Sequence, residues 1–314
     1  MICGAVCISH TPLLDRSRAE PTVEAEFGRG LREAQKAIEA WAPDFAVLFF
    51  PDHFNGFFYD LMPQFCIGMR ASSIGDFGTA PGKLSIGEDL AMSCAQSSLR
   101  AGIDVAVSYR MSVDHGAAQP LELLTSERPL ANVVPIFINC AAPPRTSFAR
   151  VRALGEAVGN WAAALDQRVV FIASGGLSHD PPLPSIANAT PDIEQRLIDG
   201  RSLNHAGRMQ RQTRIFSQVP SYVSGTSPLR ALNPDWDRAF LNDVLAGKLD
   251  LADDWEDEKI TATAGCGAHE VRTWVAALAA AKADGVPYNG SLIFYNPIKE
   301  WLTGTAIAVA SRAA

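Results

Sequence analysis

The sequence lacks the features that mark several large classes of protein. It has no run of lysine or arginine, and its formal net charge is -7, so nucleic acid and anionic membranes are poor candidates for its main partner. No apolar stretch reaches the roughly 18 to 20 residues that a membrane span needs. Residues 1–9 resemble a first strand more than a signal peptide. We therefore expect a cytoplasmic protein with a small-molecule partner. If that partner is an anion, a local arginine or lysine must bind it.

Cysteine motifs, repeats and low-complexity segments are also missing. The six cysteines include no Cys-x-x-Cys pair, and a chain of 314 residues does not need a disulfide framework, so we expect reduced thiols. What the sequence does have is apolar material. Apolar residues make up 47% of the chain and charged residues 19%, which is enough for a sizeable core.

Short apolar runs alternate with helical patterns along most of the chain. Because strands that alternate with helices form parallel sheets covered on both faces, the pattern predicts a three-layer α/β/α fold. Its sheet should be largely parallel (mixed), and its C-terminal part more helical. We expect a single catalytic domain over residues 1–314, with a helical subregion at about 191–260. The predicted strands are residues 2–8, 45–50, 103–109, 133–138, 169–173 and 303–311, and the predicted helices are residues 27–41, 88–101, 147–165 and 271–281.

Four histidines each follow one of these apolar runs: His10, His53, His115 and His179. The carboxyl ends of parallel strands gather along one rim of an open α/β sheet, and ligands bind there. Any one of these histidines could be an ordinary core or loop residue. Histidines scattered without a function, however, would fall partly in helices or on exposed turns, so we expect the four imidazoles to converge.

A carboxylate follows at the end of a glycine-spaced turn, Gly265–Glu270, which opens an apolar helix. Two histidines and one carboxylate on one face of a metal ion leave open positions opposite, as in non-haem Fe(II) oxygenases. The same set of ligands can hold catalytic zinc. We predict His10, His53 and Glu270 as the metal ligands.

Several features have more than one interpretation. Glu270 could merely complement the dipole of its helix, and His269 could replace it as the ligand. Asp52 is a weaker candidate than Glu270, because neighbouring residues in an extended segment, such as Asp52 and His53, point in opposite directions. The same metal site would suit a zinc-dependent hydrolase or amidohydrolase, and a non-catalytic binding relative of the fold is a further alternative. A serine hydrolase built on Ser178 is disfavoured, because the second glycine of Gly-x-Ser-x-Gly is missing.

Taken together, the motifs around these residues resemble those of the class III extradiol ring-cleaving dioxygenases. The resemblance extends over nearly the whole chain, and it implies a three-layer α/β fold, ferrous iron, dioxygen as co-substrate and a homo-oligomer, a tetramer or larger. By motif, His10, His53 and Glu270 match the iron ligands of that family. His115 and His179 match its acid/base pair, and we take His179 as the base and His115 as the acid, although the two roles could be exchanged. The matching segments are Ser9–Pro12, Pro51–Asp60, Gly75–Gly78, Val113–Gly116, Ser174–His179, Leu232–Pro234 and Ala268–Glu270.

The reaction that the resemblance implies is Fe(II)-dependent extradiol cleavage of a 3-substituted catechol by dioxygen in aromatic catabolism. The implied substrate is 3-(2,3-dihydroxyphenyl)propionate or 2,3-dihydroxycinnamate. Asp114 either supports a histidine or only shapes a turn. No sequence signal identifies the cation that would bind a side-chain carboxylate. Four aromatic residues either wall the pocket or belong to the core: Phe54, Phe57, Phe58 and Tyr59.

Overall fold

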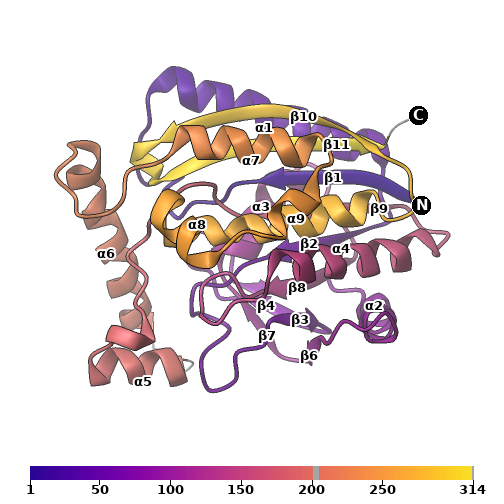
Figure 1. Cartoon of the computed structure of the whole chain (residues 1–314), viewed down its shortest axis with the longest axis horizontal. Helices are drawn as coiled ribbons and strands as arrows, with labels where there is room; N and C mark the ends of the chain where they lie inside the picture. Colours follow the sequence, from indigo (N-terminus) through magenta and orange to yellow (C-terminus); the bar gives the residue numbers. More distant parts are fainter. Residues whose placement is uncertain (201–204, 313–314) are drawn as a thin grey trace.

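The computed structural model describes residues 1–200 and 205–312, and its middle layer is an eight-stranded sheet in the order β10-β11-β1-β9-β2-β8-β3-β6 (Figure 1). β1, β9, β2 and β8 are neighbours and run parallel, whereas β10, β11 and β1 are joined by antiparallel pairing, as are β3 and β8. The sheet is therefore mixed with a parallel centre. Its strands are β1 (Ile2–Ile8), β2 (Phe45–Phe50), β3 (Phe65–Gly68), β6 (Ala106–Ser108), β8 (Val133–Ile138), β9 (Val169–Ser174), β10 (Tyr288–Ile298) and β11 (Thr303–Arg312).

Helices cover both faces of this sheet, which gives the three layers that the alternating pattern predicts. Successive side chains of a strand point to opposite faces, and β2 shows the result. Its odd-numbered residues join an apolar cluster with α2, α4 and α9, and its even-numbered residues join a second cluster with α1 and α3. The helices are α1 (Pro21–Trp41), α2 (Glu88–Arg100), α3 (His115–Thr125), α4 (Phe148–Ala163), α5 (Pro191–Asp199), α6 (His205–Val223), α7 (Pro234–Leu245), α8 (Asp257–Ala264) and α9 (Val271–Ala281), with the 3-10 turns η1 (Ile186–Asn188), η3 (Leu249–Ala252), η4 (Cys266–Glu270) and η5 (Lys299–Trp301).

Most of the predicted elements are confirmed, and one is wrong. β1, β2 and β8 coincide with their predicted ranges, and β9 and β11 extend theirs by one residue each. The predicted strand 103–109 is wrong: only Ala106–Ser108 forms β6, a largely exposed strand at the edge of the sheet. His115 follows β7 (Met111–Val113) instead. β7 belongs to a second sheet of order β5-β4-β7, with β4 (Ala71–Ser73) and β5 (Gly82–Lys83).

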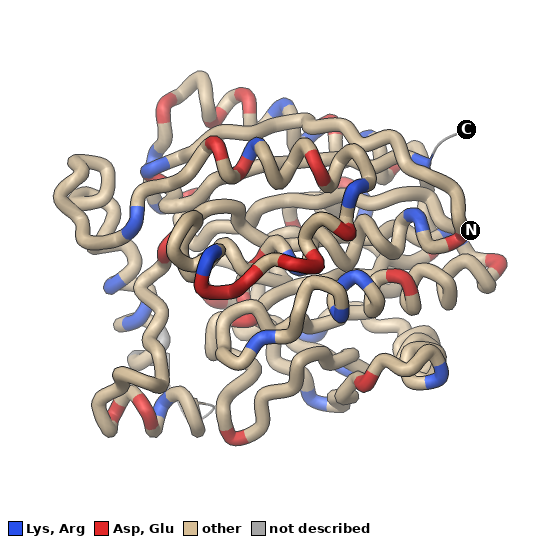
Figure 2. Tube along the Cα trace, in the orientation of Figure 1, with Lys and Arg blue, Asp and Glu red and all other residues tan. Residues whose placement is uncertain are grey.

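The chain after β9 is mostly helical until β10, in keeping with the predicted C-terminal part. α5 and α6 stand at one end of the molecule, at the left of Figure 1, and α6 contacts η5. Lys and Arg are interspersed with Asp and Glu over most of the trace (Figure 2). None of the helices in the described ranges is long and apolar enough to cross a membrane.

Candidate active site

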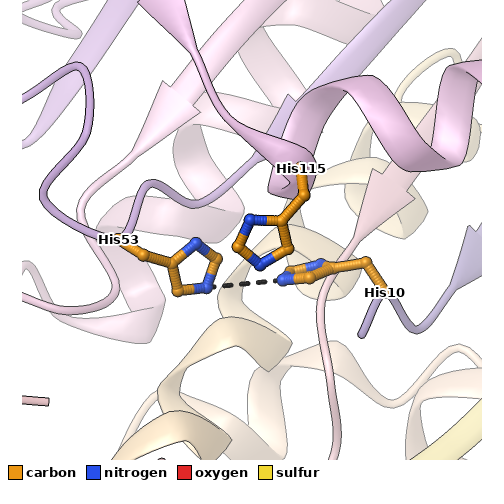
Figure 3. Close-up of side chains that lie close together, drawn as sticks. All are labelled: His10, His53 and His115. Atoms are coloured by element: carbon orange, nitrogen blue, oxygen red, sulfur yellow. Dashed lines mark hydrogen bonds between the residues drawn. The ribbon is translucent and has the colours of Figure 1, made fainter. Parts of the chain in front are cut away.

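Three of the four predicted histidines face one another at one rim of the sheet (Figure 3). His10 follows β1, His53 follows β2, and His115 is the first residue of α3. Nε2 of His10 lies 3.4 Å from Nε2 of His53. The rings of His53 and His115 are stacked, with centroids 4.6 Å apart. The imidazoles therefore converge, although His115 arrives from the small sheet and not from a strand of the large one.

Glu270 reaches the same point from η4, at the start of α9. Its Oε1 lies 3.1 Å from Nε2 of His53, and its Oε2 lies 3.6 Å from Nε2 of His10. The amide of Gly176 donates to Oε2 at 2.8 Å, which fixes the carboxylate. Burial opposes ionisation, but the charges of His10 and His179 and the hydrogen bonds from His179 and His53 hold the pKa of Glu270 well below its ordinary value. The carboxylate is thus an anion in a buried site.

The far nitrogen of each of these two imidazoles is held by a partner. Nδ1 of His10 bonds to Oγ of Ser174 at 2.9 Å, and Nδ1 of His53 bonds to Oδ2 of Asp114 at 2.9 Å. Such partners set the tautomer and ring orientation of metal-binding histidines. Asp114 also accepts from the Gly116 amide at the start of α3. Both interpretations of Asp114 are therefore correct, because one carboxylate supports His53 and shapes the turn.

The donor set fits a divalent metal ion. Two Nε2 atoms and one carboxylate come within 3.6 Å of one another from three separate segments. Nitrogen and oxygen donors of this kind suit iron and zinc alike. His115 also brings a nitrogen within 4.8 Å of ligand atoms of His10 and His53, but its Nδ1 is bonded to Asp76.

His115 and His179 differ in what holds them. Nδ1 of His115 lies 2.8 Å from Oδ2 of Asp76, and both side chains are buried. Nδ1 of His179 bonds to the neutral carbonyl of Leu177 at 2.8 Å. Burial disfavours a charge on His179, but the nearby carboxylate of Glu270, 3.4 Å from its Nε2, raises its pKa. The two histidines therefore differ at Nδ1, which faces a carboxylate in His115 and a backbone carbonyl in His179.

The glycine-spaced turn before Glu270 makes room for His179. A Cβ on Gly267 would overlap the imidazole of His179, and a Cβ on Gly176 would lie 2.8 Å from its Cε1. Gly265 has a φ of 96° and packs against the carbonyl of His179, a conformation and a contact that favour glycine. The turn thus positions the carboxylate and seats the histidine at the same time.

The four histidines line a mostly apolar pocket. Its aromatic walls are Phe77 and Trp301. The interpretation of the loop aromatics as pocket walls is wrong, because Phe57 stacks on Phe137 at 3.8 Å, and Phe54 and Phe58 pack in a separate apolar cluster. The lining residues are His10, Thr11, Pro12, Leu13, His53, Asn55, Asp76, Phe77, His115, His179, Pro181, Pro182, Leu183, Arg211, Gln212, Ile215, Trp301, Leu302 and Thr303.

Three residues considered as alternatives have other partners. His269 bonds to Oγ1 of Thr261 at 2.8 Å and to the guanidinium of Arg272, and burial lowers its pKa to about 2. Asp52 accepts from the amides of residues 55–57 and so shapes the loop after β2. The Ser178 hydroxyl donates to Oδ2 of Asp237 at 2.9 Å, and this serine is fully buried. The serine-hydrolase reading therefore has no exposed nucleophile at this position.

Sequence reasoning missed three residues of the site: Asp76, Ser174 and Arg211. Asp76 and Ser174 lie in segments that carry the family resemblance, so a search for partners of the histidines could have selected them. Arg211 lies in an arginine- and glutamine-rich helix, α6, that reads as solvent-exposed from its composition. Only the packing of α6 over the pocket reveals it.

The family and the relatives that match this chain are all named as dioxygenases. The family described as "Catalytic LigB subunit of aromatic ring-opening dioxygenase" matches residues 4–306. A protein of Paraburkholderia xenovorans (strain LB400), named 2,3-dihydroxyphenylpropionate/2,3-dihydroxicinnamic acid 1,2-dioxygenase, is 49% identical over 296 residues, which cover 94% of this chain and 93% of that protein. Proteins of the same name from Cupriavidus pinatubonensis (strain JMP 134 / LMG 1197) and Rhodococcus jostii (strain RHA1) are 47% and 45% identical, and each alignment covers 98% of both chains.

Proposed function

Because the chain belongs to the family of the catalytic LigB subunit of aromatic ring-opening dioxygenases, we propose that it cleaves 3-(2,3-dihydroxyphenyl)propionate or 2,3-dihydroxycinnamate beside the diol with dioxygen. The relatives named for these two substrates are up to 49% identical over almost the whole chain. One observation carries the proposal: His10, His53 and Glu270 place their donor atoms within 3.6 Å of one another, next to a pocket that His10, His53, His115 and His179 line. The zinc-hydrolase and binding-protein alternatives have no comparable support.

In this proposal His10, His53 and Glu270 hold ferrous iron. Iron, when bound, would supply open positions where the two catechol oxygens and dioxygen can bind side by side. The protein orients its ligands through Ser174 and Asp114, which hold the Nδ1 atoms of the two histidines. The apolar walls exclude water, which strengthens the charge interactions inside the pocket.

His179 is proposed as the base. Its Nδ1–H is held by the carbonyl of Leu177, so Nε2 is the nitrogen that can take a proton from a catechol hydroxyl. His115 is proposed as the acid, because Oδ2 of Asp76, 2.8 Å from its Nδ1, holds the ring in place where it lines the pocket. From His115 the proton would go to the oxygen that leaves when the bond between the two oxygen atoms of dioxygen breaks.

The proposal extends to the organisation of the protein. Residues 1–314 would form one catalytic domain, to which the helical subregion at about 191–260 contributes pocket residues of α6. A homo-oligomer, a tetramer or larger, and a cytoplasmic location are proposed from the family resemblance.

Oxygen uptake tests the proposal directly. The protein, loaded with ferrous iron in the presence of ascorbate, should consume dioxygen on addition of 3-(2,3-dihydroxyphenyl)propionate and form a ring-opened product that absorbs visible light. A panel with the cinnamate analogue, plain catechol, protocatechuate and 2-aminophenol ranks the substrates. If none of these compounds caused dioxygen to be consumed, or if activity were seen only with zinc, the proposed reaction would be refuted.

A further inference from the structure

One cationic side chain enters the pocket from the helical subregion. Arg211, on α6, is the only lysine or arginine among the described residues that line the pocket. α6 carries arginines but no aspartate or glutamate, and Figure 2 shows this segment without acidic positions. The pocket therefore combines apolar walls with one arginine, which bonds to the loop of the proposed ligand His53.

The guanidinium of Arg211 is held rigidly on the loop that carries His53. Its Nη1 donates to the carbonyl of Phe54 at 3.0 Å and to Oδ1 of Asn55 at 3.1 Å, and its Nη2 donates to the carbonyl of His53 at 2.8 Å. Asn55 in turn donates to Oδ2 of Asp114, the carboxylate that orients His53. The guanidinium of Arg211 is thus bonded to His53, a proposed iron ligand, and to the two residues that follow it.

Among the described residues, these bonds use only some of the N–H donors of Arg211. A guanidinium has five N–H donors, and the three bonds above use two on Nη1 and one on Nη2. In a guanidinium, the Nε–H and one Nη2–H form an edge that can bind a carboxylate with two parallel hydrogen bonds. Within the described ranges, no carboxylate forms an ion pair with Arg211, although the side chain is more than half buried. Burial and the charge of Arg196 lower the pKa of Arg211, and the charges of Asp52, Asp114 and Asp76 oppose this shift.

From this geometry we infer that Arg211 receives the side-chain carboxylate of the substrate and so selects catechols with a short anionic chain at ring position 3. The inference rests on the proposed function and deepens it. Three bonds separate the ring from the carboxylate carbon of a propionate chain, a span of about 3.8 Å, the distance that three bonds cover between successive Cα atoms. A catechol beside His53 could therefore extend its chain toward Arg211 along the apolar walls formed by Leu13, Ile215 and Phe77.

The test compares substrates with and without the carboxylate. In Arg211→Gln, kcat/KM for 3-(2,3-dihydroxyphenyl)propionate should fall by about 10- to 100-fold, the size expected for a lost hydrogen-bonded charge pair, mainly through KM. For 3-methylcatechol, kcat/KM should stay within about threefold of the wild-type value, because that substrate makes no bond to Arg211. Arg211→Lys should recover part of the loss. 3-Phenylpropionate, which has no hydroxyls to bind iron, should inhibit the wild type and lose at least tenfold in affinity in Arg211→Gln.

Two controls separate this role from a structural one. Arg214→Gln removes a charge from the exposed side of the same helix and should leave all these constants unchanged. Iron content is measured for every variant. Equal losses for the acid and for 3-methylcatechol, or loss of iron in Arg211→Gln, would show that Arg211 only holds the His53 loop; unchanged constants would show that another group binds the carboxylate. A wild-type protein that cleaves 3-methylcatechol but shows no preference for the acid would overturn the inference alone, whereas one that cleaves no catechol would refute the proposed function.

Discussion

The four histidines of the candidate active site line one pocket but have different hydrogen-bond partners. His10 and His53 lie next to the Glu270 carboxylate, and their Nδ1 atoms are held by Ser174 and Asp114. His115 is held instead by a buried aspartate, Asp76, outside this group of ligands. The proposed function divides the imidazoles accordingly: His10 and His53 hold the metal, and His115 and His179 carry a proton.

This division predicts different losses for alanine variants. His53→Ala should lose iron, because one of three protein ligands is gone. His115→Ala and His179→Ala should keep iron but lose turnover by about 10²- to 10⁴-fold, the usual contribution of a general acid or base. Metal analysis and oxygen uptake on the same samples measure both quantities. Equal loss of iron in all three variants would show the division to be wrong.

Asp76 is predicted to act through His115. Its Oδ2 lies 2.8 Å from Nδ1 of His115, and its buried Oδ1 has no hydrogen-bond partner among the described residues. Asp76→Asn keeps the shape of the side chain but replaces the carboxylate that bonds to Nδ1 of His115 with a neutral amide. We expect kcat to fall by about 10- to 100-fold, the range for a hydrogen bond to a charged group. KM and iron content should stay unchanged, and Asp89→Asn, on the exposed side of α2, is the matched control. A fall in iron content equal to the fall in kcat would contradict this role.

The turn formed by η4 connects Glu270, the proposed carboxylate ligand, to His179, a proposed proton carrier. Glu270 closes this 3-10 turn, and Gly267 within it lies against the imidazole of His179. A single short segment therefore sets the distance between the two functions. Its glycines Gly265 and Gly267 let the turn pack closely against His179.

Gly267→Ala should consequently damage catalysis more than folding. The new methyl group would overlap the His179 ring and force it to move, and a displacement of about 1 Å in an active site can cost about 10²-fold in rate. Iron should still bind, because Gly267 does not touch the ligand atoms of His10 or His53. Gly28→Ala, on α1, is the control, since only the flexible end of Arg32 lies near the new methyl group there. Turnover in Gly267→Ala within a factor of two of the wild type would refute the predicted seating of His179.

The parts of the site that follow strands were predictable from the sequence, and the parts brought by packing were not. His10, His53 and His179 come after buried parallel strands, and the rule that strand ends share a rim places them together. His115 was expected from the same rule but follows β7 of the small sheet, because residues 103–109 do not form a central strand. Arg211 was beyond prediction, since a polar helix gives no sign of the pocket that it covers. β10 was also missed, because its mixture of exposed and half-buried residues has no clear alternation.

At the scale of the whole molecule, the candidate active site brings together parts of the chain that are far apart in sequence. The loops after β1 and β2 and the start of α9 each supply one proposed ligand, and α6 closes the pocket from outside the sheet. Two large apolar clusters, one on each face of the sheet, hold these segments together. The fold therefore does not depend on the metal, although a metal would tie its segments more firmly.

Metal removal should accordingly lower stability without unfolding the protein. A ligand that binds only the folded state stabilises it by about 2.7 kcal/mol when its free concentration is 100 times its dissociation constant. For a chain of 314 residues that corresponds to a rise in Tm of roughly 4 °C. We expect the chelator-treated protein to keep its far-ultraviolet circular dichroism and to gain this Tm shift when ferrous iron is restored without oxygen. His179→Ala should show the same shift, whereas His53→Ala should show almost none, because the first variant keeps all three proposed ligands and the second lacks one. A similar shift in both variants would place the stabilising metal somewhere other than between His10, His53 and Glu270.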